Sequence, residues 1–218
     1  MDNNTIIRVI ENVKKLLINR GHDDQQLNNT MPYKYMIDRI DRFMNNDPTS
    51  LDIFINSDKK VYVKFLPKLD QRGASGIKYL ENIYKILSNA YRINENDEII
   101  FVILDIFDKE IHNIEYLFQN VTVFNYKQLL SNIVDNVYVP KHSRLTRAEK
   151  NALKKTLMID TFDKLPLIQK TDAVCRYYNF REGDVLKIER PSIGSKTHVV
   201  YRYVVSDTYN YQYSESFS

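Results

Sequence analysis

The chain has 218 residues, of which 43% are hydrophobic and 27% charged, so it can form one large domain or two small ones. Its single cysteine, Cys175, excludes an internal disulfide framework and favours a reducing compartment. The N-terminus shows no signal pattern, and no apolar run approaches the roughly 20 residues of a membrane span, so we expect no membrane association.

The net charge of +3 is unevenly distributed along the chain. Residues 1–136 carry 17 Lys+Arg against 19 Asp+Glu, a net of −2, and residues 137–218 carry 14 against 9, a net of +5. This excess predicts only weak, salt-sensitive attraction to a polyanion. A dedicated, free-standing DNA-binding protein usually carries more positive charge.

Residues 1–136 alternate between helical and strand patterns, which is typical of an α/β domain. Apolar residues recur at helical spacing in several segments, and the run 98–106 is continuous, as in a strand buried on both faces. A polar segment, 56–59, predicts a hairpin turn between two short alternating strands. The expected helices are 5–19, 32–44, 74–90, 113–118 and 126–133, and the expected strands are 51–55, 60–66, 98–106 and 121–124.

The C-terminal part begins with an extended segment at 137–142, because Pro140 biases the residue before it away from the helical region. Thr146 and Glu149 form a capping box that starts a helix running to about Thr156. Residues 162–166 are expected to form a loop.

Residues 172–205 form a compact pattern of a helical turn, a tight turn at Gly183 and two strands. The first strand, 185–189, is ended by Pro191, and the second, 199–205, follows a short loop. The stretch holds no carboxylate pair, Cys/His cluster or phosphate-binding glycine loop, which favours docking over catalysis. Residues 206–218 are polar and aromatic without a core pattern and are expected to form a flexible tail.

A series of motifs in this half resembles one family, the fifth-largest subunit of nuclear RNA polymerases, whose archaeal members have only the C-terminal domain. The resemblance covers essentially the whole chain and is strongest from Val139 onward. Its departures are Ala173, in place of a proline, and Ile193-Gly194, in place of Glu-Thr, which fit a divergent lineage such as a large DNA virus. The matching positions are Val139-Pro140-Lys141-His142, Leu145-Thr146, Glu149, Leu165-Pro166, Ile168, Asp172, Arg176, Gly183, Val185, Ile188, Arg190-Pro191-Ser192 and Tyr201-Arg202.

The resemblance implies an α+β protein of two domains. Residues 1–136 would be a jaw domain with an endonuclease-like core that lacks its active site, and residues 137–205 a small assembly domain. The chain would be a non-catalytic subunit of a DNA-directed RNA polymerase, docked on the largest subunit and beside downstream double-stranded DNA. It would have no catalytic residue, cofactor, metal or small-molecule substrate. It would act in the nucleus if cellular, and in the host cytoplasm or virion if viral.

Candidate contact residues follow from the resemblance and from charge. Arg190 and Arg202 are suited to bidentate pairing with carboxylates across an interface, although internal salt bridges are an equal alternative. The full set expected to bind a partner is Pro140, His142, Arg176, Arg190, Pro191, Ser192 and Arg202. A basic cluster could meet phosphates or an acidic subunit surface, or be a solvated face; it comprises Lys141, Arg144, Arg147, Lys150, Lys154 and Lys155.

Two other functions are alternatives, a metal-dependent nuclease and a free-standing DNA-binding adaptor. Asp52 and Lys64 occupy positions where endonuclease-like cores hold Mg²⁺, but Tyr62 replaces the second acid, so both are interpreted as solvated strand residues. His142 is interpreted as a hydrogen-bonded residue that fixes its loop, since no other ligand lies at metal-binding spacing. Cys175 has no activating neighbour and is interpreted as a small buried residue.

Overall fold

The computed structural model describes residues 2–67, 74–104, 106, 108–118, 120–191 and 197–206. The chain folds into two compact units, Met1–Ser131 and Asn132–Ser218, which divide ahead of Asn136, the expected boundary. No helix in these ranges is long and apolar enough to cross a membrane. Ser192, the Ile193-Gly194 departure and all of the expected tail except Ser206 lie outside the described residues.

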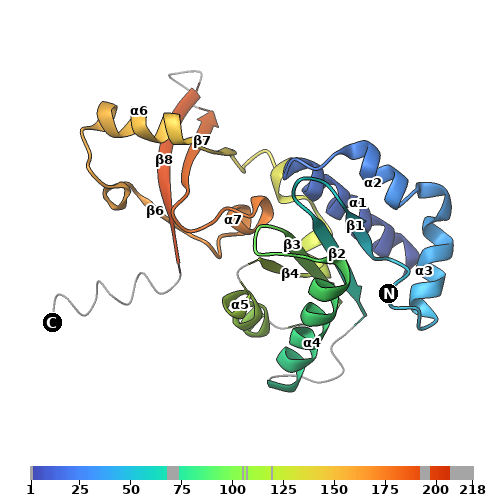
Figure 1. Ribbon diagram of the computed structural model, residues 1–218. Helices are drawn as coiled ribbons and strands as arrows, with labels where there is room; N and C mark the ends of the chain where they lie inside the picture. Colours follow the sequence, from blue (N-terminus) through green and yellow to red (C-terminus); the bar gives the residue numbers. More distant parts are fainter. Residues whose placement is uncertain are drawn as a thin grey trace. The chain divides into compact units, whose positions relative to one another are not determined.

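The first unit is built on a four-stranded sheet with the strand order β1-β2-β3-β4 (Figure 1). β1 pairs with β2 in the predicted antiparallel hairpin, whereas β2, β3 and β4 run parallel to one another. Every residue of β2 is buried, so the alternating pattern expected for this strand is wrong: a central strand covered on both faces has no solvent side. The strands are β1 (Ile53–Ile55), β2 (Val61–Leu66), β3 (Glu98–Ile103) and β4 (Val121–Asn125).

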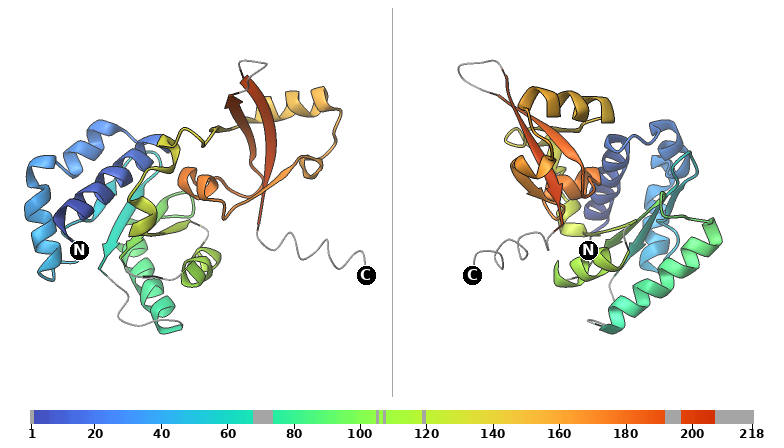
Figure 2. Two further views of the ribbon diagram at one scale, coloured as in Figure 1. Left: turned by 180° about the vertical axis from the view of Figure 1, so that it is seen from behind. Right: turned by 60° about the vertical axis from the view of Figure 1, so that its left-hand side comes forward.

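Helices cover both faces of this sheet (Figures 1 and 2). The helices α4 and α5 pack on the face that carries Tyr62, Phe101 and Val123, and α1 to α3 lie on the other. Gly21, with φ of 96°, ends α1 as its position predicts. The helical segments are α1 (Asn3–Asn19), α2 (Asp24–Thr30), η1 (Tyr33–Tyr35), α3 (Met36–Met44), α4 (Ala74–Tyr91), α5 (Asp108–Leu117) and η2 (Tyr126–Leu129).

Several helix predictions for this unit were wrong in detail. The segment expected at 32–44 is a 3₁₀ turn followed by α3, whose buried residues are Met36, Ile40 and Phe43. The helix expected at 126–133 is the short η2, because the extended backbone of Asn132 breaks the helical path. The sequence pattern did not indicate α2, and α5 starts well before residue 113.

The second unit is a four-stranded sheet with the order β5-β7-β8-β6 and one α-helix on each face (Figure 1). On one face Val185 packs with Leu153 of α6, and on the other Leu186 and Ile188 pack with Cys175 of α7. The capping box of Thr146 and the turn at Gly183, with φ of 86°, are both confirmed. The elements are η3 (Ile133–Asp135), β5 (Lys141–Arg144), α6 (Arg147–Leu157), η4 (Phe162–Lys164), β6 (Leu167–Gln169), α7 (Ala173–Tyr178), β7 (Val185–Pro191) and β8 (Thr197–Val205).

Candidate protein-interaction face

The register of the second sheet gathers basic side chains on one of its faces. Ile188 pairs with both His142 and Val200, and Arg190 pairs with His198. Directly paired residues place their side chains on the same face, and residues two apart along a strand do likewise. The basic sheet face is therefore defined by His142, Arg190, His198 and Arg202.

This face also carries α7, because Leu186, Ile188 and Val200 belong to the hydrophobic cluster that Cys175 and Phe180 complete. The buried part of the cluster fixes the strands, and the basic residues extend the same face toward solvent. Arg190 and His198 are exposed, whereas His142 and Arg202 are partly buried. The fold thus presents positive charge on a rigid sheet rather than on a loop.

His142 is held in place by its own backbone neighbourhood. Its Nδ1 lies 2.7 Å from the carbonyl oxygen of Pro140, which agrees with the predicted role in fixing the entry segment. Burial lowers the pKa of His142, and the charges of Arg190 and Arg202 lower it further, against the raising effects of the Pro140 carbonyl and Asp172. The imidazole of His142 is therefore disposed to be neutral, and Arg190 and Arg202 carry the positive charge of the face.

The two arginines of this face have no carboxylate partner within the described residues. Arg202 donates from Nη1 to the carbonyl oxygen of Leu167 at 3.4 Å, and Arg190 makes no ion pair with any described acid. Of the two alternatives for these arginines, an internal salt bridge is thus not seen in the described part of the chain. Their guanidinium groups can still donate hydrogen bonds to a carboxylate of a partner protein.

The other predicted partner residues lie at varied places. Arg176 sits in the last turn of α7 and is partly buried. Pro140 precedes β5 and engages His142 through its carbonyl, and Pro191 is the last residue of β7, paired with Thr197. The structure therefore brings His142, Arg190 and Arg202 together and adds His198. His198 was not predicted from the sequence, although it lies four residues before Arg202 on the same strand and so on the same face.

Three of the six members of the basic cluster are engaged within the second unit. Lys150 donates from Nζ to the carbonyl oxygen of Gly183 at 3.0 Å, and Lys154 to that of Asp160 at 2.5 Å. Arg144 is occupied by an internal ion pair with Asp184. These three side chains tie elements of the unit together. The remaining members, Lys141, Arg147 and Lys155, are exposed.

The nuclease-like constellation in the first unit is a buried ion pair. Lys64 Nζ lies 2.8 Å from Asp52 Oδ2, and the two side chains are 8% and 9% exposed, so their interpretation as solvated residues was wrong. Tyr62 donates its hydroxyl to the same oxygen at 2.7 Å. Burial raises the pKa of Asp52, whereas the bonds from Lys64 and Tyr62 lower it. No cluster of metal-ligating side chains occurs among the described residues.

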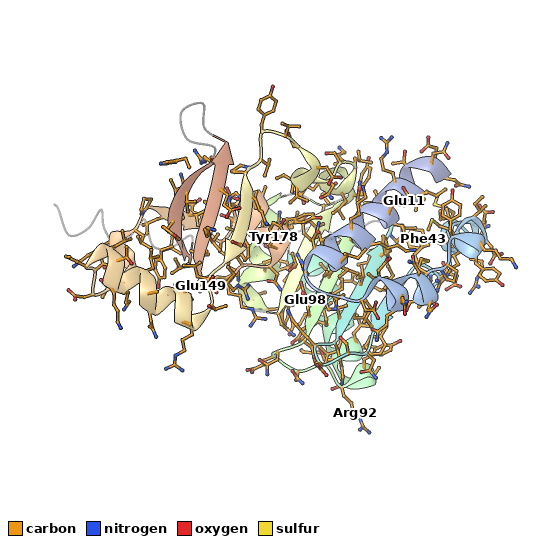
Figure 3. All side chains as sticks on the ribbon, turned by 90° about the horizontal axis from the view of Figure 1, so that it is seen from above. Glu11, Phe43, Arg92, Glu98, Glu149 and Tyr178 are labelled. Atoms are coloured by element: carbon orange, nitrogen blue, oxygen red, sulfur yellow. The ribbon has the colours of Figure 1, made fainter. Side chains whose placement is uncertain are left out.

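A second buried ion pair in this unit escaped sequence reasoning. Glu98, labelled in Figure 3 at the start of β3, is fully buried and pairs with Arg20, whose side chain is 3% exposed. Lys59 approaches the other carboxylate oxygen at 3.6 Å. The sequence did hold a sign of this pair, because Glu98 is an acidic residue at the start of the continuous apolar run 98–106. The pair anchors the end of α1 to the sheet.

Cys175 is a core residue, as expected. Its side chain is fully buried, and burial raises the pKa of its thiol to about 12, with Asp172 and Asp184 adding to the shift. A thiol with so high a pKa is not ionised at neutral pH and is no nucleophile.

Residues 131–204 match the family described as RNA polymerase Rpb5, C-terminal domain. Among curated proteins, the DNA-directed RNA polymerases I, II, and III subunit rpabc1 of Dictyostelium discoideum is 42% identical over 82 residues, or 38% of this chain and 41% of that protein. The corresponding subunit RPABC1 of Caenorhabditis elegans is 38% identical over 78 residues, or 36% of each chain. The chain therefore aligns with less than half the length of these relatives.

A longer alignment reaches into the first unit. The DNA-directed RNA polymerases IV and V subunit 5B of Arabidopsis thaliana is 28% identical over 151 residues, which is 68% of this chain and 65% of that protein.

Proposed function

We propose, from the match of residues 131–204 to the Rpb5 C-terminal domain family, that the chain is a non-catalytic subunit of a multisubunit DNA-directed RNA polymerase. The family match is the observation that carries this proposal. The similar proteins are themselves named as subunits of RNA polymerases, and one alignment extends over 68% of the chain. Nucleotide addition would belong to the large subunits.

The basic sheet face would dock on the largest subunit. Arg190 and Arg202 support this role because no described carboxylate pairs with them, so binding can satisfy them without breaking an internal ion pair. A partner surface that offers carboxylates would gain charge-assisted, bidentate hydrogen bonds. Pro140, Arg176 and Pro191 would add contacts to the largest subunit, as would Ser192, which lies outside the described residues.

The first unit would serve as the jaw domain beside downstream DNA. Its sheet, a hairpin continued by parallel strands, suits an endonuclease-like core, and the Asp52–Lys64 pair fills the place where that core would hold its metal. Lys141, Arg147 and Lys155 remain available for phosphate contacts or an acidic subunit surface. The chain would act in the nucleus, or in the host cytoplasm or virion if its source is a virus.

Charge reversal tests the docking role. Arg190→Glu combined with Arg202→Glu should abolish co-purification of the largest polymerase subunit with the tagged chain. Lys164→Glu combined with Arg181→Glu makes the same change in charge at two exposed positions of the second unit that lie outside both candidate contact sets, and should leave co-purification intact. Equal loss in both double variants would contradict docking through the basic sheet face.

The nuclease and free-standing adaptor alternatives make different predictions for the isolated chain. A nuclease would show Mg²⁺-dependent cleavage that Asp52→Ala removes, and an adaptor would bind duplex DNA tightly. The subunit role predicts no cleavage and weak binding that fades at physiological salt, about 0.15 M. A cleavage assay and a salt titration of DNA binding separate the three.

A further inference from the structure

We propose that the outer edge of β8, residues 197–201, binds an extended acidic segment of a partner polypeptide as an added strand of the second sheet. This inference rests on the proposed function, since the partner would be another chain of the polymerase. It concerns the backbone edge of β8, which side chains of the basic sheet face flank.

Among the described residues, one side of β8 has no paired strand over about half its length. β7 pairs with β8 from Thr197 to Tyr203, along one side. On the other side β6 pairs only with residues 203–205. Among the described residues, no strand therefore lies beside residues 197–201 on that side. An open strand edge is a template for pairing with another chain.

The backbone of β8 directs its unpaired groups to this open edge. Val204 donates its N–H to Asp184 O at 2.9 Å and accepts from Gly183 N at 3.0 Å, so even-numbered residues face β7. Tyr203 donates to Pro166 O at 3.0 Å, and Val205 O accepts from Lys170 N at 2.8 Å, so odd-numbered residues face the β6 side.

Antiparallel pairing alternates these directions along a strand. The N–H and C=O groups of Thr197, Val199 and Tyr201 must then point to the open edge, where no described group pairs with them. A partner strand would satisfy all three residues without disturbing any hydrogen bond to β7.

The side chains that flank the edge specify the partner's chemistry. His198 and Arg202 flank it on the basic sheet face, with Arg190 paired to His198. Val199 and Tyr201 flank it on the opposite face, and Val199 is 36% exposed. An added strand with acidic residues at alternate positions and apolar residues between them would complement both faces.

The same charges disfavour a second copy of this chain as the occupant. Each copy would bring a further set of Arg190 and Arg202 cations to the paired edge, whereas an acidic segment would bring carboxylates with which these arginines can pair. The observations therefore favour a heterologous partner with negative charge.

Amide hydrogen exchange resolved to single residues tests the proposal on the full chain, free and within polymerase purified from its native source. In the free chain the amides of Val199 and Tyr201 should exchange fast, and those of Val200 and Arg202 slowly. In the complex, Val199 and Tyr201 should slow by about tenfold or more, as expected for a formed backbone hydrogen bond.

The outcomes that overturn the inference are distinct. Fast exchange of both amides in the complex would show that the edge stays open, although the proposed function would stand. Slow exchange of these amides in the free chain at low concentration would show that a segment of this chain covers the edge. Slow exchange that appears only at high concentration of the free chain would show that a second copy covers it. Absence of polymerase subunits from the purified material would refute the proposed function, and this inference with it.

A matched pair of variants gives a second test. Val199→Pro removes the outward N–H but no hydrogen bond to β7, and proline is tolerated at such edge positions. Val199→Thr keeps the N–H and the β-branched shape. The proline variant should lower affinity for the polymerase about tenfold relative to the threonine variant, with the melting transition of the free chain retained. Equal affinities of the two would overturn the proposal.

Discussion

Arg144 and Asp184 are joined through Arg144 Nε and Asp184 Oδ2 at 2.9 Å, which ties β5 to the turn that precedes β7. The same guanidinium donates from Nη2 to Asn179 O at 2.9 Å and lies 5.5 Å from the ring of Phe180. Asp184 Oδ2 also accepts from the backbone N–H of Arg181 at 2.7 Å. The charge of Arg144 is thus used inside the unit.

Replacing Arg144 should therefore affect stability. We expect Arg144→Ala to lower the free energy of unfolding by about 1–2 kcal/mol, since the lost hydrogen bonds are partly solvent-screened. Arg147→Ala, an exposed position three residues along, should change it by less than about 0.5 kcal/mol. Urea denaturation of both variants measures the difference, and equal stabilities would contradict the structural role of Arg144.

Replacing only one partner of the buried Asp52–Lys64 ion pair should lower the free energy of unfolding strongly. Asp52→Asn leaves the Lys64 ammonium buried without its counter-charge, which costs about 3–5 kcal/mol of stability. Adding Lys64→Met removes the stranded charge and should restore much of the loss. Thermal and urea unfolding of the single and double variants test this; a single variant as stable as the wild type would refute the buried ion pair.

Cys175 should resist modification in the native chain. Its thiol is fully buried, and burial raises its pKa to about 12, so the thiol is not ionised at neutral pH and a reagent cannot reach it. A thiol reagent at neutral pH should label it only after denaturation. Rapid stoichiometric labelling, while circular dichroism shows that the chain is still folded, would contradict the burial of this thiol.

Regular features of the sequence predicted α6, the helical turn of α7 and the strands β7 and β8, whereas β5 and β6 were not predicted as strands. The capping box of Thr146 and the turn at Gly183 depend on local chemistry that sequence reports directly. The contacts of the basic cluster could not be predicted, because a backbone carbonyl acceptor such as that of Gly183 comes close to Lys150 only in the folded chain. Pairing register, which places His198 beside Arg190, is likewise a tertiary property.

In the first unit, hydrophobic runs predicted the strands well and the polar pairs badly. Lys64 and Glu98 are charged residues on buried strands, and charge alone suggests exposure. Arg20 lies 78 residues before Glu98, so only the fold reveals this pair. Asp52 and Lys64 were grouped from the sequence as a possible metal site, but their burial as an ion pair was not predicted. The mismatch between residue type and strand position was the signal available.

Acidification should weaken the second unit through His142. Burial lowers its folded pKa below 6.5, so the unfolded state binds the proton more readily. The stabilising effect of a neutral imidazole is present above pH 6.5 and is lost as the pH falls through 6.5 toward the folded pKa.

The variant His142→Gln isolates this effect. We expect unfolding free energies measured between about pH 5 and 7.5 to fall less with acid in this variant than in the wild type. The pKa of His22 in the first unit is also lowered by burial, so His22→Gln is the matched control for titration elsewhere. An identical pH slope in wild type and His142→Gln would contradict the assignment.

The central claim is that the chain is a subunit of an RNA polymerase. Affinity purification of the tagged full chain from native lysate, followed by mass spectrometry of the co-purifying proteins, tests it most directly. The account predicts stoichiometric recovery of the largest polymerase subunits, retained at physiological salt. Recovery of the chain without any large polymerase subunit would contradict it.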